Sequence, residues 1–248
     1  MFYLKLKTVR VRRSNPSALA LALAMMLTML CVYLISLSAI PEQKTNSVSG
    51  QTVASAEVHM EGLEVSFLLH ARTTNQLEAR VLAARCADAG GAGLILSDGA
   101  DYCVISQAVS AENAGTNDLH LRADGLSLKL QGSSDEIAAV SDSIAFLRAL
   151  ATETSGLAAA IENGDTDLPS VCSLLDVYRT QGQKALNELE NISGSDDTIR
   201  RLISSVHASL TRIDSAIENP GIGKIKLIHA AACGEWISIL EEFVAEES

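Results

Sequence analysis

The chain is 248 residues long, 48% hydrophobic and only 4% aromatic, with a formal net charge of −11. That length allows one or two small domains beside a targeting segment. All thirty acidic residues lie after Pro41, with only fourteen of the nineteen Lys and Arg, so this part has a formal charge of −16. Nucleic acid and anionic lipid both require clustered positive charge, so the balance disfavours them as partners. Solubility alone also accounts for such an acidic surface.

The N-terminus predicts a membrane helix. Residues 1–16 contain five basic residues and no acid, and residues 17–40 are uncharged and almost wholly apolar. About twenty apolar residues cross a bilayer core, and a basic flank stays in the cytoplasm. A cleaved signal peptide is the alternative, but its apolar core usually has only about 7–15 residues. We therefore predict an uncleaved signal-anchor at 17–40, a cytoplasmic N-terminus and a large extracytoplasmic part.

Beyond the membrane segment the composition changes twice. A flexible linker is predicted at 41–60, because Glu42–Glu57 is polar, rich in Ser and without hydrophobic periodicity. Residues 61–132 have an α/β pattern, and residues 133–248 have helical periodicity throughout. The predicted fold class is therefore α+β.

The first half of the α/β segment is predicted to form a strand, a helix and a strand. Leu63–Ala71 has the β-branched and aromatic content typical of a strand. Thr73 or Thr74 is expected to cap a helix over Asn75–Ala89, which the following glycines end. Ala92–Ser97 is the second predicted strand. One face of the helix is traced by Leu77, Val81, Ala84 and Asp88.

Two Asp-Gly pairs predict hairpin turns in the second half. Asp98-Gly99 leads into a third strand, Tyr102–Val109, and Ser110 starts a very short helix. Asp124-Gly125 interrupts Leu119–Leu130, in which apolar and polar residues alternate. The order strand, helix, strand, strand, short helix, strand is that of a split ferredoxin-like βαββαβ fold.

The two halves repeat one pattern. In "VSFLLHARTTNQLEA" (Val65–Ala79) and "YCVISQAVSAENA" (Tyr102–Ala114) a strand runs into a helix start. This duplication resembles the SPOR domains of bacterial cell envelopes, which usually place Tyr, Ser and Ala where Tyr102, Ser110 and Ala114 stand. The resemblance covers residues 63–130. It implies a ferredoxin-like domain that binds septal peptidoglycan whose glycan strands have lost their stem peptides.

The resemblance also implies that glycan binds on the open face of the sheet. In the first strand Val65, Phe67 and Leu69 alternate with a less apolar set, as do Cys103 and Ile105 in the third strand. We expect the more apolar sets to pack on the helices. The candidate binding residues on the open face are Ser66, Leu68, His70, Tyr102, Val104 and Ser106. The alternative is that the C-terminal helices cover this face and make it part of the core.

Residues 133–248 predict four helices with short loops, which favours an antiparallel bundle. A capping box, Ser133 with Glu136, begins the first, and Asn163-Gly164 ends it. Asp167 begins the second helix, Ser195 caps the third, and "NPGIGK" turns the chain into the fourth. A SPOR-like domain followed by such helices is similar to envelope proteins of spore-forming clostridia.

The sequence contains no motif for catalysis or for a cofactor. It has no GxSxG elbow and no Ser-x-x-Lys motif. Gly90–Gly93 follows a helix and precedes a strand, the wrong order for a phosphate-binding loop. His229 and Cys233 lie one helical turn apart, but a second pair with ligand spacing is missing, so no metal site is predicted. The four cysteines after Cys31 form no CxxC pair and are predicted to be core thiols.

Two functions from different classes remain. In the first, a non-enzymatic, membrane-anchored envelope protein binds peptidoglycan glycan strands through its SPOR-like domain, in cell division or sporulation. In the second, the helical region docks an envelope partner protein and the SPOR-like domain is only structural. A large exposed apolar stripe on the helices would favour the second function. An amidase-like hydrolase is disfavoured, because both metal ligands and a nucleophile motif are missing.

Overall fold

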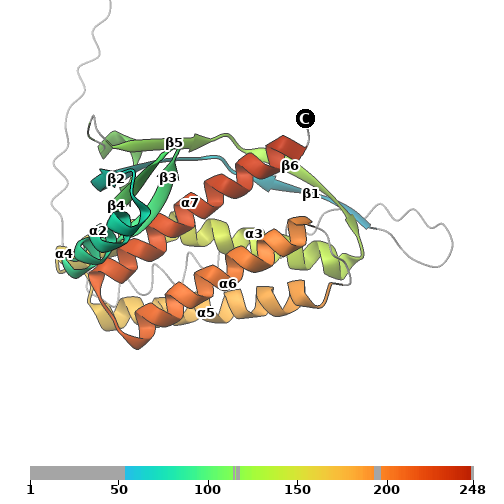
Figure 1. Cartoon of the computed structure of the whole chain (residues 1–248). Helices are drawn as coiled ribbons and strands as arrows, with labels where there is room; N and C mark the ends of the chain where they lie inside the picture. The colour runs from blue at the N-terminus through green and yellow to red at the C-terminus, as the bar shows by residue number, and fades with distance from the viewer. Residues whose placement is uncertain (1–53, 114, 116–117, 193–196, 247–248) are drawn as a thin grey trace, which may run out of the picture. The chain divides into compact units, whose positions relative to one another are not determined.

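A sheet region that includes one helix comes first in the chain and further helices follow, so the predicted mixture of sheet and helices is confirmed (Figure 1). The computed structural model describes residues 54–113, 115, 118–192 and 197–246. The predicted N-terminal segment 1–16, the membrane span at 17–40 and the first part of the linker lie outside the described residues.

Four strands form one antiparallel sheet in the order β3-β4-β2-β5. The strands are β2 (Leu63–Thr73), β3 (Leu94–Asp98), β4 (Asp101–Val109) and β5 (Leu119–Ala123). Helix α2 (Gln76–Asp88) joins β2 to β3, and the 3-10 turn η1 (Ala111–Asn113) precedes β5. The predicted order of elements is therefore confirmed, with the second helix reduced to one turn. The first predicted hairpin is also confirmed, because Asp98 lies opposite Asp101 and Gly99 has a φ of +62°.

A second, two-stranded sheet extends the first. It consists of β1 (Ala54–Met60) and β6 (Leu126–Gly132). The two strands pair in the same register as β2 and β5, so β1–β2 and β5–β6 form one long antiparallel ribbon. The ribbon is interrupted where Gly62 meets Gly125. A Cβ atom on Gly62 would lie 2.7 Å from the carbonyl oxygen of Ala123, so the two backbones approach closely only with glycine there.

Two predictions about this ribbon are wrong. Asp124-Gly125 is not a hairpin turn, because β5 pairs with β2 and β6 pairs with β1. Gly125 is required because two backbones approach closely there. The sequence alone does not distinguish such a glycine from the glycine of a turn. The predicted linker at 41–60 is not a linker from Ala54 onwards, because these residues form β1 along β6. Ala56 and Met60 of that strand are buried.

Helix α2 packs through a different face from the one traced in its sequence. The residues that face the sheet are the small side chains Ala79, Ala83 and Cys86, which lie against Val104 of β4. Small side chains let the helix lie close to the strands. Leu77 and Val81 point the other way and are 71% and 48% exposed. Leu82 is partly buried against the same cluster, so Leu77 and Val81 are the large apolar residues that α2 leaves on its outer surface.

Asn75 caps α2, whereas Thr73 or Thr74 was predicted to do so. Its side-chain oxygen accepts hydrogen bonds from the backbone N–H of Leu77 at 2.9 Å and of Glu78 at 3.2 Å. We expect Asn75→Ala to lower the free energy of unfolding by about 1 kcal/mol, because an N-cap is lost, and Thr74→Ala to change it little. Denaturant unfolding of the two variants checks this. Equal losses would contradict the assignment of the cap.

The described residues from Ser134 to Glu246 form five helices. They are α3 (Ser134–Glu153), α4 (Leu157–Glu162), α5 (Leu168–Glu190), α6 (Asp197–Glu218) and α7 (Ile222–Glu246). The capping box at Ser133 is confirmed. The first of the four predicted helices is broken into α3 and α4, where Gly156 has a φ of +81°. The predicted apolar stripes of the other three are buried, for example at Leu175, Val206 and Trp236.

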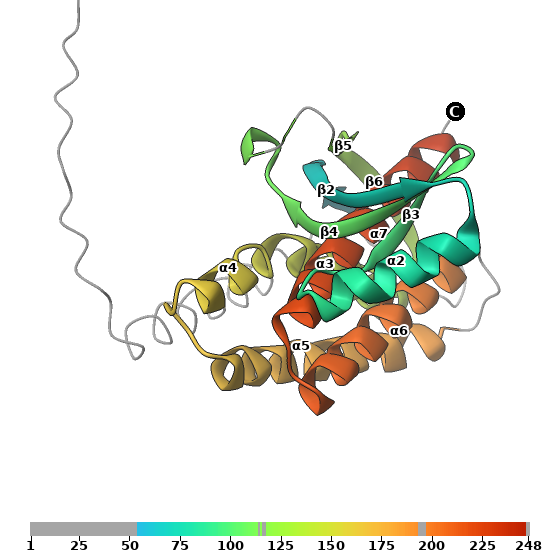
Figure 2. The same cartoon turned by 60° about the vertical axis from the view of Figure 1, so that its left-hand side comes forward.

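Helix α7 lies between the sheet and the other helices (Figure 1). It contacts β2, β4 and β5 as well as α3 and α6. Along β4, Val104 faces α2, so its equally buried neighbours Cys103 and Ile105 face the opposite side, towards α7. Figure 2 shows α2 alongside β3 and β4. The predicted α/β and helical segments therefore belong to one compact unit of the chain, Pro41–Ser248.

A tryptophan connects the sheet, the ribbon and the helices. Trp236 is the only Trp of the chain and is 1% exposed. Its Nε1 donates a hydrogen bond of 3.0 Å to the carbonyl oxygen of Glu61, next to the point where Gly62 interrupts the ribbon. The hydrogen bond satisfies the polar atom that Trp brings into the core. Its fluorescence therefore reports on the contact between α7 and the ribbon.

One stretch of the described residues, Ser134–Glu162, is long and apolar enough to cross a membrane by length and composition alone. The core helix of a folded unit meets the same criterion. Val140, Ile144 and Leu147 of α3 are buried within the unit, where α3 contacts α5 and α7. We therefore interpret this stretch as part of the core.

Candidate functional site

The residues predicted to share an open sheet face do not share one. They were Ser66, Leu68, His70, Tyr102, Val104 and Ser106. Ser66 and Val104 are fully buried, and Tyr102 packs partly buried on the cluster beneath α2. Ser106 is half-buried and donates its hydroxyl hydrogen to the carbonyl oxygen of Leu68 at 3.0 Å. His70 alone of the six is exposed, so the prediction of a solvent-open face is wrong at the centre of the sheet.

Ser66 contacts a histidine that is distant in the sequence, so the sequence alone did not predict the pair. Ser66 and His120 are opposite each other on β2 and β5, with Ser66 Oγ 2.7 Å from His120 Nδ1. The nearby Asp118 carboxylate accepts hydrogen bonds from the backbone N–H of Leu69 and of Gly115. Since Ser66 is fully buried, its hydroxyl cannot reach a substrate. The pair is therefore a cross-strand contact that stabilises the edge of the sheet.

His229 and Cys233 are core residues. Cys233 Sγ lies 3.4 Å from His229 Nε2 and donates to the carbonyl oxygen of Ala151 at 3.5 Å. Burial raises the pKa of the Cys233 thiol to about 12. A thiol that stays protonated is a poor metal ligand. The described residues also contain no group of three or more His, Cys, Asp or Glu side chains that could hold a metal ion.

Stability is expected to decline below neutral pH because of His229. Burial lowers the pKa of this histidine in the folded state, against the opposite effect of its hydrogen bond to Ala151. The unfolded chain therefore takes up the proton first. The free energy of unfolding should be highest above the ordinary His pKa of about 6.5 and should fall as the pH drops towards the lower folded-state pKa.

Two variants test this pH dependence. His229→Gln should flatten the loss of stability between about pH 7 and pH 5, the range in which an ordinary histidine titrates. His207→Gln, at an exposed position of α6, serves as the matched control for the substitution itself. Urea unfolding at a series of pH values measures both slopes. Equal slopes for His229→Gln and the unaltered chain would contradict the assignment.

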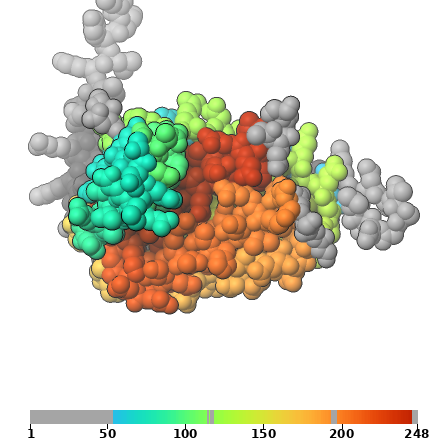
Figure 3. All heavy atoms as spheres, viewed as in Figure 1, coloured from blue at the N-terminus to red at the C-terminus, as the bar shows by residue number. Residues whose placement is uncertain are grey.

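A groove of about 250 Å³ lies between the edge strand β3 and the helices α6 and α7. Leu94 and Leu96 of β3 give it an apolar wall, and the small residues Ala231 and Gly234 of α7 also line it. Its polar lining comes from Arg201 and Arg212 of α6 and from Glu235 and Ser238 of α7. In the space-filling view of Figure 3, α7 (red) reaches the surface between the sheet with α2 (green and teal) and α6 (orange).

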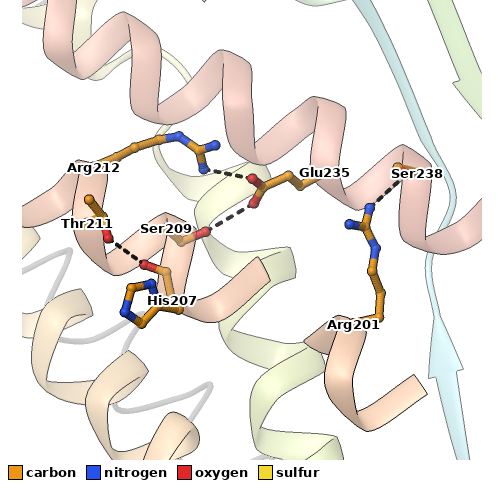
Figure 4. Close-up of polar contacts among 7 residues, drawn as sticks. All are labelled: Arg201, His207, Ser209, Thr211, Arg212, Glu235 and Ser238. Carbon is orange, nitrogen blue, oxygen red and sulfur yellow. Dashed lines mark hydrogen bonds and ion pairs between the residues drawn. The ribbon is translucent and has the colours of Figure 1, made fainter. Parts of the chain in front are cut away.

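Polar contacts between α6 and α7 order the lining, and Figure 4 draws those made by Glu235 and Ser238 of α7. Arg212 Nη1 donates to Glu235 Oε1 at 2.8 Å, and Ser209 Oγ donates to Glu235 Oε2 at 3.3 Å. Arg201 Nη2 donates to Ser238 Oγ at 2.9 Å. Its Nε lies 3.2 Å from Glu242 Oε2, an ion pair by distance but without the angle of a hydrogen bond. Each guanidinium therefore has a carboxylate beside it.

This arrangement fits an extended polypeptide better than a small anion. The two carboxylates balance the two guanidinium charges, so these groups give the groove no net positive charge. Each arginine has five N–H donors and still has some for carbonyl oxygens of a ligand. In the described part of the chain β3 pairs only with β4, so its outer edge has no strand neighbour. An extended segment can add to such an edge as a further strand.

A larger hollow, of about 530 Å³, lies where α3 begins and α5 ends. Two of the acids that line it have structural partners. Glu136 belongs to the capping box, and Glu188 lies 3.6 Å from Lys184 Nζ. The hollow is therefore lined in part by side chains that already have structural roles, and it has little apolar wall for a ligand.

The groove leaves only a partial signal in the sequence. Arg201 and Arg212 are eleven residues apart, which places them on one face of α6, and Glu235, Ser238 and Glu242 share a face of α7. The sequence does not show that β3, about a hundred residues earlier, comes to lie beside these faces. In comparisons with known proteins, no family model matches the chain, and no curated protein and no solved structure is similar to it.

Proposed function

We propose that the chain is a non-enzymatic, membrane-anchored extracytoplasmic protein that docks a partner protein. The partner supplies an extended segment with apolar side chains, which adds to the outer edge of β3 and lies against Leu94 and Leu96. The sheet is then a structural module of the unit. One observation carries the proposal: α2 and α7 cover the two faces of the sheet, whereas a groove lies beside its β3 edge.

The composition of β3 supports docking at this edge. Edge strands are usually protected against pairing by Lys, by Pro or by a bulge. Leu94–Asp98 has neither Lys nor Pro and pairs with β4 without a register shift. Leu94, Ile95 and Leu96 are all partly exposed. Such an apolar, regular edge is suited to accept another strand.

Binding of peptidoglycan glycan strands is the second candidate, and the strand order favours it. The antiparallel order β3-β4-β2-β5, with α2 between β2 and β3, is the order expected of a ferredoxin-like βαββαβ domain, with η1 in place of its second helix. That order supports the resemblance to SPOR domains. Glycan would then contact the accessible margin at His70, Leu68 and Tyr102. The buried Ser66 and Val104 count against it.

Membrane anchoring rests on the sequence of the N-terminus. Residues 17–40 are long and apolar enough to span, and the basic residues before them favour a cytoplasmic N-terminus. Protease added to intact protoplasts should then degrade the part after Pro41. Full protection of that part would overturn the proposed location.

Site-specific photo-cross-linking in cells tests the docking groove. A photoreactive residue at Leu96, on the groove wall, should form adducts with one partner protein. The matched control is Val177 on α5, which is 41% exposed and does not line the groove. Arg212→Ala should weaken the adduct at Leu96, because it removes donors and frees Glu235. Equal adducts at both positions, or none at Leu96, would overturn the proposal.

The same full chain distinguishes the second candidate. Co-sedimentation with amidase-stripped sacculi, lost in Tyr102→Ala, would favour glycan binding over docking. Retention in the supernatant together with adducts at Leu96 favours docking.

A further inference from the structure

Helix α2 has an apolar outer stripe that the fold leaves uncovered. Leu77, Val81 and Ala84 follow one another at helical spacing, and all three are exposed. Among the described residues only four large hydrophobic side chains are exposed, and Leu77 and Val81 are two of them. Figure 3 shows α2 (teal) at the surface of the unit. A contiguous apolar patch of this kind is a candidate interaction surface.

On one flank of this stripe the charges are complementary to those of a second copy, whereas Arg80 lies on the other flank. Glu78 lies in the first turn of α2 and Arg85 in the last, seven residues apart and therefore on the same flank of the stripe. If two α2 helices pack antiparallel about an axis between positions 81 and 82, Glu78 of each copy lies level with Arg85 of the other. Asp88 of each copy then lies near the helix N-terminus of the other, where a negative charge is favoured.

The net charge of α2 also suits self-association. After Pro41 acidic residues outnumber basic residues by about two to one, so most of the surface repels a second copy. Helix α2 contains two acids and two arginines and is neutral. The stripe is therefore an apolar and uncharged region on an acidic protein.

We infer that α2 is a self-association surface at which two copies pack their α2 helices antiparallel. The contact joins Leu77, Val81 and Ala84 of both copies and is flanked by two Glu78–Arg85 ion pairs. A stable interface commonly buries about 800 Å² on each partner, more than one helix of this length offers, so the contact is weak in dilute solution. Anchoring in a membrane, which belongs to the proposed function, raises the effective concentration of the copies.

Cysteine cross-linking of the full chain in membranes tests the inference. The background carries Cys31→Ser and Cys172→Ser, because the other cysteines are buried. Under a mild oxidant, Val81→Cys should give a disulfide-linked homodimer with about tenfold the yield of the control Val177→Cys, equivalent to about 1.4 kcal/mol of preference. Val81 is 48% and Val177 41% exposed, so the two cysteines differ little in accessibility.

Charge exchange provides the specific control. In the Val81→Cys chain, Glu78→Arg or Arg85→Glu alone should reduce the homodimer, because each places like charges together. The double exchange Glu78→Arg with Arg85→Glu should restore it. Equal yields at positions 81 and 177, no recovery in the double exchange, or cross-links from position 81 only to other proteins would overturn the inference. None of these results depends on adducts at Leu96, so docking in the groove stands or fails separately.

Discussion

Residues 54–132, separated from the helices, are expected not to unfold cooperatively. The face of the sheet that α7 covers carries Phe67 and Ile105, both completely buried, together with Cys103. Each fully buried large apolar side chain contributes roughly 1.5–3 kcal/mol, and a whole domain is stable by only about 5–15 kcal/mol. Exposing this face removes a large part of that stability, and the contact of Trp236 with Glu61 is lost as well.

Denaturant unfolding followed by circular dichroism measures this effect. Residues 54–248 serve as the control and should unfold in one transition. Residues 54–132 should bind a hydrophobic dye. Their circular dichroism should change gradually with denaturant, without a flat region at low denaturant that marks a folded state. A sharp transition for the shorter segment would show that the sheet is an independent domain, as a separate SPOR-like domain requires.

Two glycines within helices are expected to respond with opposite sign to the same substitution. Gly182 of α5 lies where α3 and α6 approach, and a Cβ there would be 2.6 Å from Phe146 Cζ and 2.9 Å from Leu210 Cδ2. Gly182→Ala should lower the free energy of unfolding by about 1–3 kcal/mol, because overpacking outweighs the gain in helix propensity. At Gly234 of α7 a Cβ would meet only Leu96 Cδ2, at 3.8 Å. Gly234→Ala should raise the free energy by up to about 1 kcal/mol.

Thermal and urea unfolding of the two variants decide between these outcomes. Combining Gly182→Ala with Phe146→Leu should recover part of the loss, because the smaller side chain makes room for the added methyl group. A change of the same sign at both glycines would contradict the close approach of the three helices.

Helical periodicity predicted the C-terminal helices well and α2 poorly, and the reason lies in the size of the side chains. On α5 the large apolar residues, such as Leu175 and Leu189, are the buried ones. On α2 the buried face consists of Ala79, Ala83 and Cys86, while Leu77 and Val81 are exposed. A stripe of large apolar residues in a helix sequence therefore predicts an apolar helix face. It does not predict whether that face is buried by other elements of the same chain or left exposed.

The sheet face was predicted incorrectly because of irregular strand geometry and long-range packing. Two register shifts interrupt the pairing of β2 with β4, on either side of Leu69. Successive side chains of β2 therefore do not alternate regularly between the two faces of the sheet. The covering of the second face by α7 joins residues more than a hundred positions apart, such as Leu96 and Gly234. The order of elements along the chain from β2 to β5, by contrast, follows from local signals, and it was predicted correctly.

Labelling of the native cysteines is the most direct test of the claim that both faces of the sheet are covered. Cys86 lies between α2 and the sheet, and Cys103 lies on the opposite face, towards α7. Cys172 on α5 is half-buried and serves as the internal control. Under native conditions, peptide-resolved mass spectrometry should find Cys172 labelled first, with Cys86 and Cys103 protected until the unit unfolds. Labelling of Cys103 at a rate close to that of Cys172 would show that this face is open and would contradict the account.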